Sequence, residues 1–140
     1  MMDVDCIFCK IAAGTLPSYT IYEDGEFKII LDRFPWIGGH TLIILKRHAE
    51  TFFELTKQEG ARLFELTSAA ANALNNTLTP DGLNIIQNNG EAAGQSVAHF
   101  HMHIIPRYKN DEINILFPHN DPPVADFEKI LPGIKINFKI

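Results

Sequence analysis

The chain has 140 residues, 46% of them hydrophobic, and a formal net charge of −5 at pH 7. This length supports one packed core and is too short for two ordinary domains, so we expect a single soluble domain over residues 1–140. An acidic chain without a Lys and Arg cluster is unsuited to coating the backbone of DNA or RNA. A mononucleotide remains possible as a ligand, because a small phosphate ester needs only a few local donors.

The N-terminal residues carry no targeting signal that the sequence makes visible. No apolar run approaches the roughly 20 residues that span a bilayer, and Met1-Met2-Asp3-Val4-Asp5 lacks the basic start of a signal peptide. We therefore expect a cytoplasmic protein without a membrane partner. In such a compartment the pair Cys6 and Cys9, a CxxC motif, favours metal or redox chemistry over a disulfide.

The regular elements follow from hydrophobic spacing and turn residues. Residues Cys6–Ala13 have the spacing of a short helix, which Gly14 ends. The turn signal Asp24-Gly25 predicts a hairpin, and Arg33–Gly39 predicts a loop. Apolar, β-prone runs predict strands at Ile21–Glu23, Phe27–Leu31, His40–Leu45 and Leu83–Gln87.

The clearest helix starts at the capping box Thr56-Lys57-Gln58-Glu59 and ends at Pro80-Asp81-Gly82. Residues at helical spacing predict its buried face, namely Leu63, Phe64, Thr67, Ala70, Ala71, Leu74 and Leu78. We interpret it as a packing helix without catalytic residues. With the strands it predicts an α+β domain, an antiparallel sheet with its long helix on one face.

The residues after Tyr108 hold four of the eight prolines and show only weak regularity. Val124–Leu131 has the pattern of a helix, and Lys135–Ile140 alternates as a strand does.

The most unusual stretch is Gln95–Ile105, which we predict to be a strand. In it His99, His101 and His103 alternate with apolar residues, so the three imidazoles share one face of a strand that Pro106 ends or places at an edge. A lone inward His is more often a core residue, and an uninterrupted terminal tract is more often a tag. Three internal, interleaved imidazoles instead favour a metal or catalytic role.

The stretch resembles the signature of the histidine triad (HIT) hydrolases, three His alternating with hydrophobes and followed by two more. Here it is His99-Phe100-His101-Met102-His103-Ile104-Ile105. The resemblance, to the bacterial branch of the family, extends over about residues 6–107 and fades in the tail 108–140. It also includes Ile7-Phe8-Cys9-Lys10-Ile11, Leu31-Asp32, Gly39-His40-Thr41-Leu42, Lys46-Arg47-His48 and Asn88 with Gly94-Gln95-Ser96. It implies a HIT-like fold with a short N-terminal helix.

By this resemblance His101 is the nucleophile, which attacks the α-phosphorus of a nucleotide and forms a nucleotidyl-histidine that water hydrolyses. An Nδ1–H bond from His101 to a backbone carbonyl would leave its Nε2 free for that attack. His103 and Ser96 would supply donors to the phosphate, and His99 completes the catalytic triad.

The same resemblance implies a nucleotide-binding set. Asp32 would bind the ribose, Phe8, Ile11, Leu16, Leu31 and Arg33 would line the base pocket, and Asn88, Gly94, Gln95, Ser96, Val97, His101 and His103 would surround the phosphate or leaving group. Taken alone, the apolar members are ordinary core residues. The turn over residues 90–94 is not a P-loop, because it lacks the Gly-Lys-Ser/Thr ending and precedes a strand.

Some bacterial relatives bind zinc through Cys and His residues that correspond to Cys6, Cys9, His48 and His99. Four protein ligands make a closed, structural zinc site, one per chain. The alternative is a pair of reduced thiols beside two core imidazoles. His40 matches a recurrent family His, with a role either in orienting another imidazole or in the core.

The function implied is hydrolysis of purine nucleoside phosphoramidates or related nucleotidyl conjugates. One alternative is hydrolysis of dinucleoside polyphosphates, and another is a zinc-stapled nucleotide-binding or scaffolding protein with little turnover. The presence of His103, where transferase relatives usually carry Gln, favours hydrolysis. The family resemblance also implies a homodimer that binds AMP-type or GMP-type nucleotides.

Overall fold

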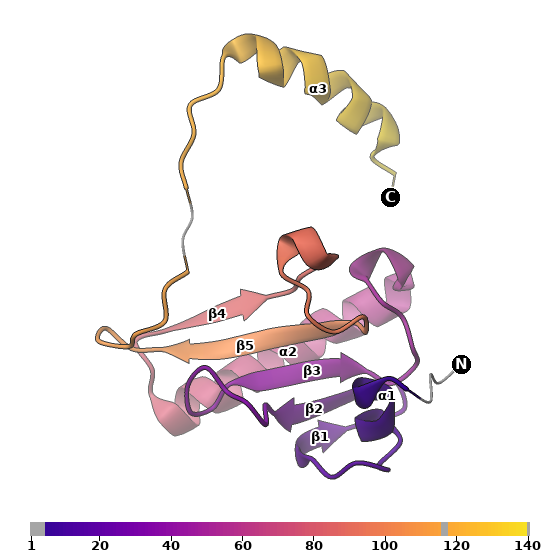
Figure 1. Cartoon of the computed structure of the whole chain (residues 1–140), viewed down its shortest axis with the longest axis vertical. Helices are drawn as coiled ribbons and strands as arrows, with labels where there is room; N and C mark the ends of the chain where they lie inside the picture. The colour runs from indigo at the N-terminus through magenta and orange to yellow at the C-terminus, as the bar shows by residue number, and fades with distance from the viewer. Residues whose placement is uncertain (1–4, 116–117, 140) are drawn as a thin grey trace.

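The computed structural model describes residues 5–115 and 118–139. Three helices and five strands make up the fold (Figure 1). In chain order they are α1 (Ile7–Ala12), β1 (Tyr19–Glu23), β2 (Phe27–Leu31), β3 (Thr41–Leu45), α2 (Lys57–Leu78), β4 (Gly82–Ile86), β5 (His101–Arg107) and α3 (Val124–Asn137). No helix within the described ranges is long and apolar enough to cross a membrane.

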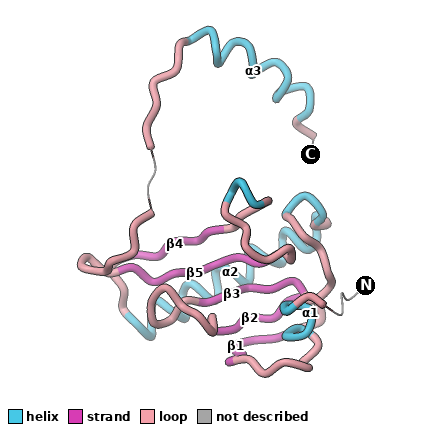
Figure 2. Tube along the Cα trace, viewed as in Figure 1, coloured by secondary structure: helices cyan, strands magenta, loops and turns pink. Residues whose placement is uncertain are grey.

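The five strands form one antiparallel sheet in the order β1-β2-β3-β5-β4, with α2 across one face and α1 over the other (Figures 1 and 2). Alternation along the strands divides the core in two. Ile43, Leu45 and Met102 pack with α2, whereas Ile30, Leu42 and Ile44 pack with Phe8 of α1. The predicted α+β class is confirmed.

Helix α2 begins and ends where its sequence signals predict. The side chains of Thr56 and Glu59 bond reciprocally to each other's backbone N–H, at 3.1 and 2.8 Å. The predicted buried face is wrong at one position, because Phe64 is 63% exposed and Leu66 is buried in its place. The buried stripe therefore follows the spacing Leu63, Leu66, Ala70 and Leu74.

The predicted triad strand begins too early. The chain turns before it, where the backbone N–H of His99 bonds to the carbonyl of Val97, and β5 starts only at His101. Pro106 lies inside β5 rather than at its end. Its missing N–H is tolerated because β5 pairs with β3 only as far as Ile104.

The predicted strand at Lys135–Ile140 is also wrong. Residues 135–137 continue α3, and Ile140 lies outside the described residues. Pro132 and Gly133 lie inside α3, and the apolar positions Ile130 and Ile134 keep helical spacing across them.

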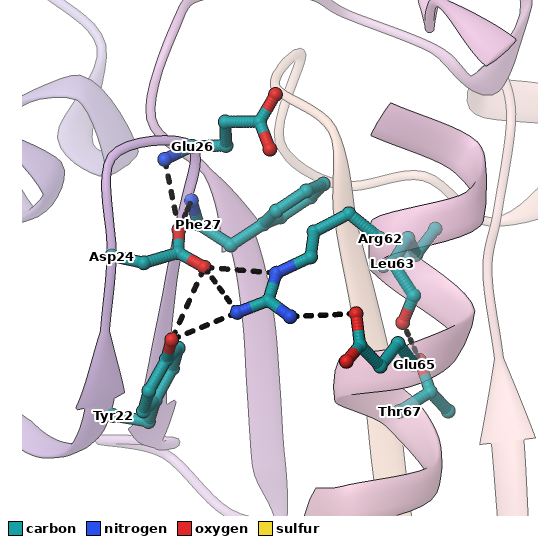
Figure 3. A network of polar contacts seen from close by, with 8 residues as sticks. All are labelled: Tyr22, Asp24, Glu26, Phe27, Arg62, Leu63, Glu65 and Thr67. Atoms are coloured by element: carbon teal, nitrogen blue, oxygen red, sulfur yellow. Dashed lines mark hydrogen bonds and ion pairs between the residues drawn. The ribbon is translucent and has the colours of Figure 1, made fainter. Parts of the chain in front are cut away.

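A polar network ties the first hairpin to α2 (Figure 3). One oxygen of Asp24 accepts the backbone N–H of Glu26 and of Phe27, both at 2.8 Å, which closes the turn between β1 and β2. The other oxygen accepts two hydrogen bonds from Arg62 of α2, which also bonds to Tyr22 and Glu65. The ion pair between Asp24 and Arg62 thus fixes the start of β2 against α2. Asp32 directly follows the other end of β2.

A second anchor joins the start of α2 to the end of β3. The guanidinium of Arg47 donates to both carboxylate oxygens of the buried Glu59, at 2.6 and 2.7 Å. These bonds lower the pKa of Glu59 to about 2. The pair also fixes the backbone beside His48.

The substitution Glu59→Gln should therefore lower the free energy of unfolding by about 1–2 kcal/mol at pH 7, because it weakens both the ion pair and the helix cap. A carboxylate with a lowered pKa stabilises the fold above its unfolded pKa of about 4.5, and this contribution disappears as pH falls toward 2. Urea unfolding of both proteins should show the difference shrinking over that window. Glu26→Gln, the same change at an exposed side chain, is the control, and an equal loss in both variants would contradict the assignment.

Candidate functional site

A pocket of about 790 Å³ lies on the α1 side of the sheet, within the roughly 300–1,000 Å³ of small-molecule sites. Side chains of α1, β2, β3 and β5, together with the loops after α1, after β2 and before β5, line it. The predicted residues in its wall are Phe8, Ile11, Leu16, Leu31, Asp32, Arg33, Asn88, Gly94, Ser96, Val97, His101 and His103.

His101 presents one ring nitrogen to the pocket. Its Nδ1 lies 2.7 Å from the backbone carbonyl oxygen of His99, which can only accept, so Nδ1 carries the proton and Nε2 has a free lone pair. Burial lowers the pKa of His101, so the ring is neutral at pH 7. Phe8 packs on it with ring centroids 4.9 Å apart and restricts its rotation. A neutral, fixed imidazole of this kind is a competent nucleophile.

A chain of hydrogen bonds fixes the proton of His103. The backbone N–H of Trp36 donates to Nδ1 of His40 at 3.2 Å, so His40 carries its proton on Nε2. That Nε2–H donates to Nδ1 of His103 at 2.9 Å, which leaves the proton of His103 on Nε2. His40 thus orients the third triad imidazole, one of the two roles that the sequence left open.

His103 is held neutral and partly shielded from water. The Trp36 indole stacks on it at 17° with centroids 6.1 Å apart, and the His101 ring meets it edge-on with centroids 4.9 Å apart. Burial lowers the pKa of His103 to about 4, and the neighbouring His101 and His40 add to this effect. His103 can therefore donate a hydrogen bond at neutral pH without carrying charge.

Asp32 closes β2 beside these imidazoles. Its Oδ1 accepts the backbone N–H of Phe34 at 3.0 Å, and its Oδ2 lies 3.6 Å from Nδ1 of His40. Asp32, His40 and His103 lie close enough to share a metal ion, but the bonds just described already use the imidazole nitrogens between them. We interpret the group as a hydrogen-bonded network with a carboxylate available to hydroxyl donors.

The loop before β5 contributes polar groups to the pocket wall. Ser96, Asn88 and Gly94 line the pocket, and the Asn88 amide donates to the carbonyl of Gly94 at 3.4 Å. Gly94 has φ +84°, which a residue with a Cβ adopts only with strain.

Two predicted residues do not line the pocket. The side-chain amide of Gln95 accepts a hydrogen bond from the backbone N–H of Gly90 and donates to the carbonyls of Glu50 and Val97. These bonds stabilise the loop before β5. The ring of His99 turns toward the cysteines, because β5 has not yet begun at that residue. The backbone carbonyl of His99, rather than its imidazole, accepts the hydrogen bond from Nδ1–H of His101.

The four predicted metal ligands meet in one cluster. Their donor atoms all lie within 4.8 Å of one another, although they come from α1, the chain after β3 and the turn before β5. The Nδ1 atom of His99 lies 3.3 Å from Sγ of Cys6 and 3.6 Å from Sγ of Cys9, and Nδ1 of His48 lies 3.4 Å from Sγ of Cys9.

This donor set fits a tetrahedral zinc ion. Zinc bonds of about 2.0 Å to nitrogen and 2.3 Å to sulfur separate neighbouring ligand atoms by about 3.5 Å, as is found. His99 is fully buried and donates its Nε2–H to the carbonyl of Leu45 at 2.7 Å, which turns the lone pair of Nδ1 toward the thiols. No disulfide joins Cys6 and Cys9.

Several pocket residues carried no prediction. They include Tyr19, Phe34 and Trp36, all exposed by more than half, and the smaller wall residues Pro17 and Ser18. For Phe34 and Trp36 the sequence did offer a signal, because both aromatic residues lie in the loop Arg33–Gly39 that directly follows Asp32.

Comparison with known proteins identifies the family. The sequence profile of the HIT domain matches residues 13–110. Protein hit of Bacillus subtilis is 48% identical over 104 residues, which are 74% of this chain and 72% of that protein. The crystal structure of a HIT family member from Bacillus subtilis matches with a TM-score of 0.90 at 40% identity, over 97% of this chain and 99% of that one. The chain belongs to the HIT domain family.

Two further relatives carry functional descriptions. Adenylylsulfatase HINT3 of Arabidopsis thaliana is 41% identical over 107 residues, which are 76% of this chain and 54% of that protein. A zinc-bound histidine triad protein of Mycobacterium smegmatis matches with a TM-score of 0.73 at 35% identity, over 92% and 91% of the two chains. The family thus includes nucleotide hydrolases and zinc-bound members.

The imidazole of His103 should stay neutral, with its proton on Nε2, from pH 7 down to about pH 5. Its folded pKa of about 4 lies below the value of 6.5 expected when unfolded, so this group destabilises the fold as pH falls between these values. Nitrogen-15 NMR of the histidine rings measures both the tautomer and the titration. The same protein unfolded in urea is the control, and a folded midpoint near 6.5 would contradict the assignment.

Proposed function

We propose that this protein hydrolyses purine nucleoside phosphoramidates or related nucleotidyl conjugates through a covalent intermediate on His101. The observation that carries the proposal is the fixed tautomer of His101, with Nδ1 on the His99 carbonyl and Nε2 facing a pocket of nucleotide size. HIT family membership and the HINT3 relative support hydrolysis of a bond to a nucleotide phosphate.

In the first step, Nε2 of His101 attacks the α-phosphorus opposite the leaving group. The N–P bond forms, the bond from phosphorus to the leaving group breaks, and its electron pair departs with the leaving group. The imidazole becomes cationic, and the bond from Nδ1–H to the carbonyl of His99 stabilises that charge. His103 Nε2–H and the Ser96 hydroxyl would donate to the phosphate oxygens.

In the second step, water attacks phosphorus, the N–P bond breaks and its electron pair returns to His101. The hydroxyl of this water stays on the nucleoside monophosphate and its proton is released to solvent, which balances the proton that the leaving group takes up from solvent as it departs in the first step. Because His103 is neutral and accepts from His40, we assign it a hydrogen-bonding role rather than net proton donation.

The nucleoside would occupy the half of the pocket nearest α1 and β2. Asp32 has an oxygen available for the ribose hydroxyls, and Leu16, Leu31 and Ile11 would contact the base. A dinucleoside polyphosphate gives the same intermediate, so the leaving group decides between these substrates. The HINT3 description adds adenylyl sulfate, another nucleotidyl conjugate, as a substrate to test.

We also propose that Cys6, Cys9, His48 and His99 hold one structural zinc ion per chain. The donor geometry and the zinc-bound relative support this assignment. With all four positions taken by protein, the ion would link α1 to the turn before His101 and supply rigidity rather than a catalytic water. Thiolate ligands require a reducing compartment, which supports the cytoplasm as the location.

Replacing His101 with Ala should abolish hydrolysis of an adenosine phosphoramidate, by at least about 10³-fold, because His103, the neighbouring neutral imidazole, carries its proton on Nε2 and has no free lone pair there. Intact-mass spectrometry of wild-type protein, quenched in mild alkali within the first turnovers, should show one adenylyl adduct that His101→Ala lacks.

His119→Ala, the same change in the tail, should keep both adduct and turnover. AMP affinity measured by calorimetry shows whether the His101 variant keeps its pocket. AMP binding by wild-type protein without adduct or turnover on a phosphoramidate, a dinucleoside polyphosphate or adenylyl sulfate would support the nucleotide-binding scaffold instead.

Native mass spectrometry should find one zinc ion per chain. Its removal by chelator, or His48→Asn, should lower the midpoint of thermal unfolding by about 10 °C or more, because a structural zinc site contributes directly to folding. His119→Asn should change neither zinc content nor stability. Metal-free protein of unchanged stability would rule the assignment out.

A further inference from the structure

Trp36 is held in place although its indole is half exposed. Its backbone N–H donates to Nδ1 of His40 at 3.2 Å, and its ring stacks on His103 and meets His40 with centroids 5.5 Å apart. The side chain is nevertheless 54% exposed and lines the pocket. An indole that is fixed in this way and keeps accessible ring surface is a preformed surface for stacking, because aromatic rings associate through their faces.

The wall of the pocket is buried on one side and exposed on the other. Phe8 and Leu42, on the side of α1, are each at most 8% exposed. Phe34 and Trp36, in the loop that joins β2 to β3 (Figure 1), are 83% and 54% exposed. Trp36 therefore borders the part of the pocket that opens to solvent.

The two steps of the reaction place different parts of the substrate on these two sides. The leaving group departs in the first step, whereas the nucleoside monophosphate stays bonded to His101 until water attacks. A group that departs first needs a path to solvent that the bound nucleotide does not block. The buried side therefore suits the nucleoside, and the open side beside Trp36 suits the leaving group.

The position of Trp36 also limits the linker between phosphorus and a stacked group. The rings of His101 and His103 have centroids 4.9 Å apart, and those of His103 and Trp36 have centroids 6.1 Å apart. The indole is thus separated from the nucleophile by a single imidazole, so a short linker suffices. An arylmethyl amine meets this condition. A dinucleoside polyphosphate instead places at least one further phosphate and a ribose before its second base.

On the basis of the function proposed above, we propose that Trp36 is a specificity-determining residue that stacks on a planar aromatic amine as the leaving group. In the first step the bond from phosphorus to the amine nitrogen breaks, and its electron pair departs with the nitrogen, which takes up a proton from solvent. The stacking contact is the same in the bound substrate and in the transition state, so it lowers KM and leaves kcat unchanged.

The test compares two adenosine phosphoramidates that differ in the shape of the amine. Benzylamine presents a planar ring, whereas cyclohexylmethylamine has the same carbon skeleton with a puckered ring that cannot lie flat on an indole. For wild-type protein KM should be about tenfold lower for the benzylamine conjugate, as one aromatic stack provides. Trp36→Leu should remove this difference by raising KM for the benzylamine conjugate alone, and Trp36→Phe should retain part of it.

The matched control is Phe53→Leu, which removes an aromatic ring that is 85% exposed and does not line the pocket. This variant should keep the wild-type preference for the benzylamine conjugate. If Trp36→Leu impairs both conjugates equally, Trp36 has a purely structural role and the proposal is overturned.

A second measurement needs no turnover, because Trp36 is the single tryptophan of the chain and its fluorescence reports on that side chain directly. In the His101→Ala variant the benzylamine conjugate should shield Trp36 from quenching by acrylamide. AMP, which has no leaving group, should bind without shielding it.

The two measurements separate this proposal from the proposed hydrolysis. Shielding by the benzylamine conjugate without turnover by wild-type protein would contradict the hydrolysis and support the stacking role of Trp36. Shielding by AMP would place the nucleoside on Trp36 and overturn the stacking role. So would a benzylamine conjugate that calorimetry shows to be bound but that leaves the indole open to acrylamide.

Discussion

The register between β3 and β5 is the constraint on which the site depends. Leu42 lies opposite His103 and Ile44 opposite His101, so both imidazoles face the α1 side while Met102 and Ile104 face α2. A slip of one residue would bury the imidazoles under α2 and expose the core. The packing of α2 therefore holds β5 in register, and the capping box and the Arg47 ion pair hold α2 in place.

Each histidine acquires its role from the partner of its other ring nitrogen. A backbone carbonyl bonded to Nδ1 leaves His101 with an unprotonated Nε2, and a carbonyl bonded to Nε2 leaves His99 with an unprotonated Nδ1 beside the cysteines. Because Nδ1 of His103 accepts a hydrogen bond from Nε2–H of His40, the proton of His103 lies on Nε2, which can donate. The three side chains thus adopt two tautomers, with the proton on Nδ1 in His101 and on Nε2 in His99 and His103. Burial lowers the pKa of all three.

The N-terminal segment connects the Cys and His cluster to the pocket. Helix α1 carries Cys9 toward His48 and His99 on one side and places Phe8 against His101 on the other. Because this six-residue helix is too short to be stable alone, its position depends on those contacts. Loss of the cluster would disturb the pocket wall as well as the fold.

The sequence by itself determined the elements with strong periodicity or turn signals, the α+β class and the HIT resemblance. It also identified the four residues of the Cys and His cluster and most of the pocket wall, because these lie within motifs whose residue types are specific. It did not indicate that Gln95 lies outside the pocket wall, missed Trp36, and misjudged the start of β5 and the length of α3. Tertiary structure alone decided the first three of these points, since side-chain direction in a turn and ring tautomers depend on contacts between residues far apart in the chain.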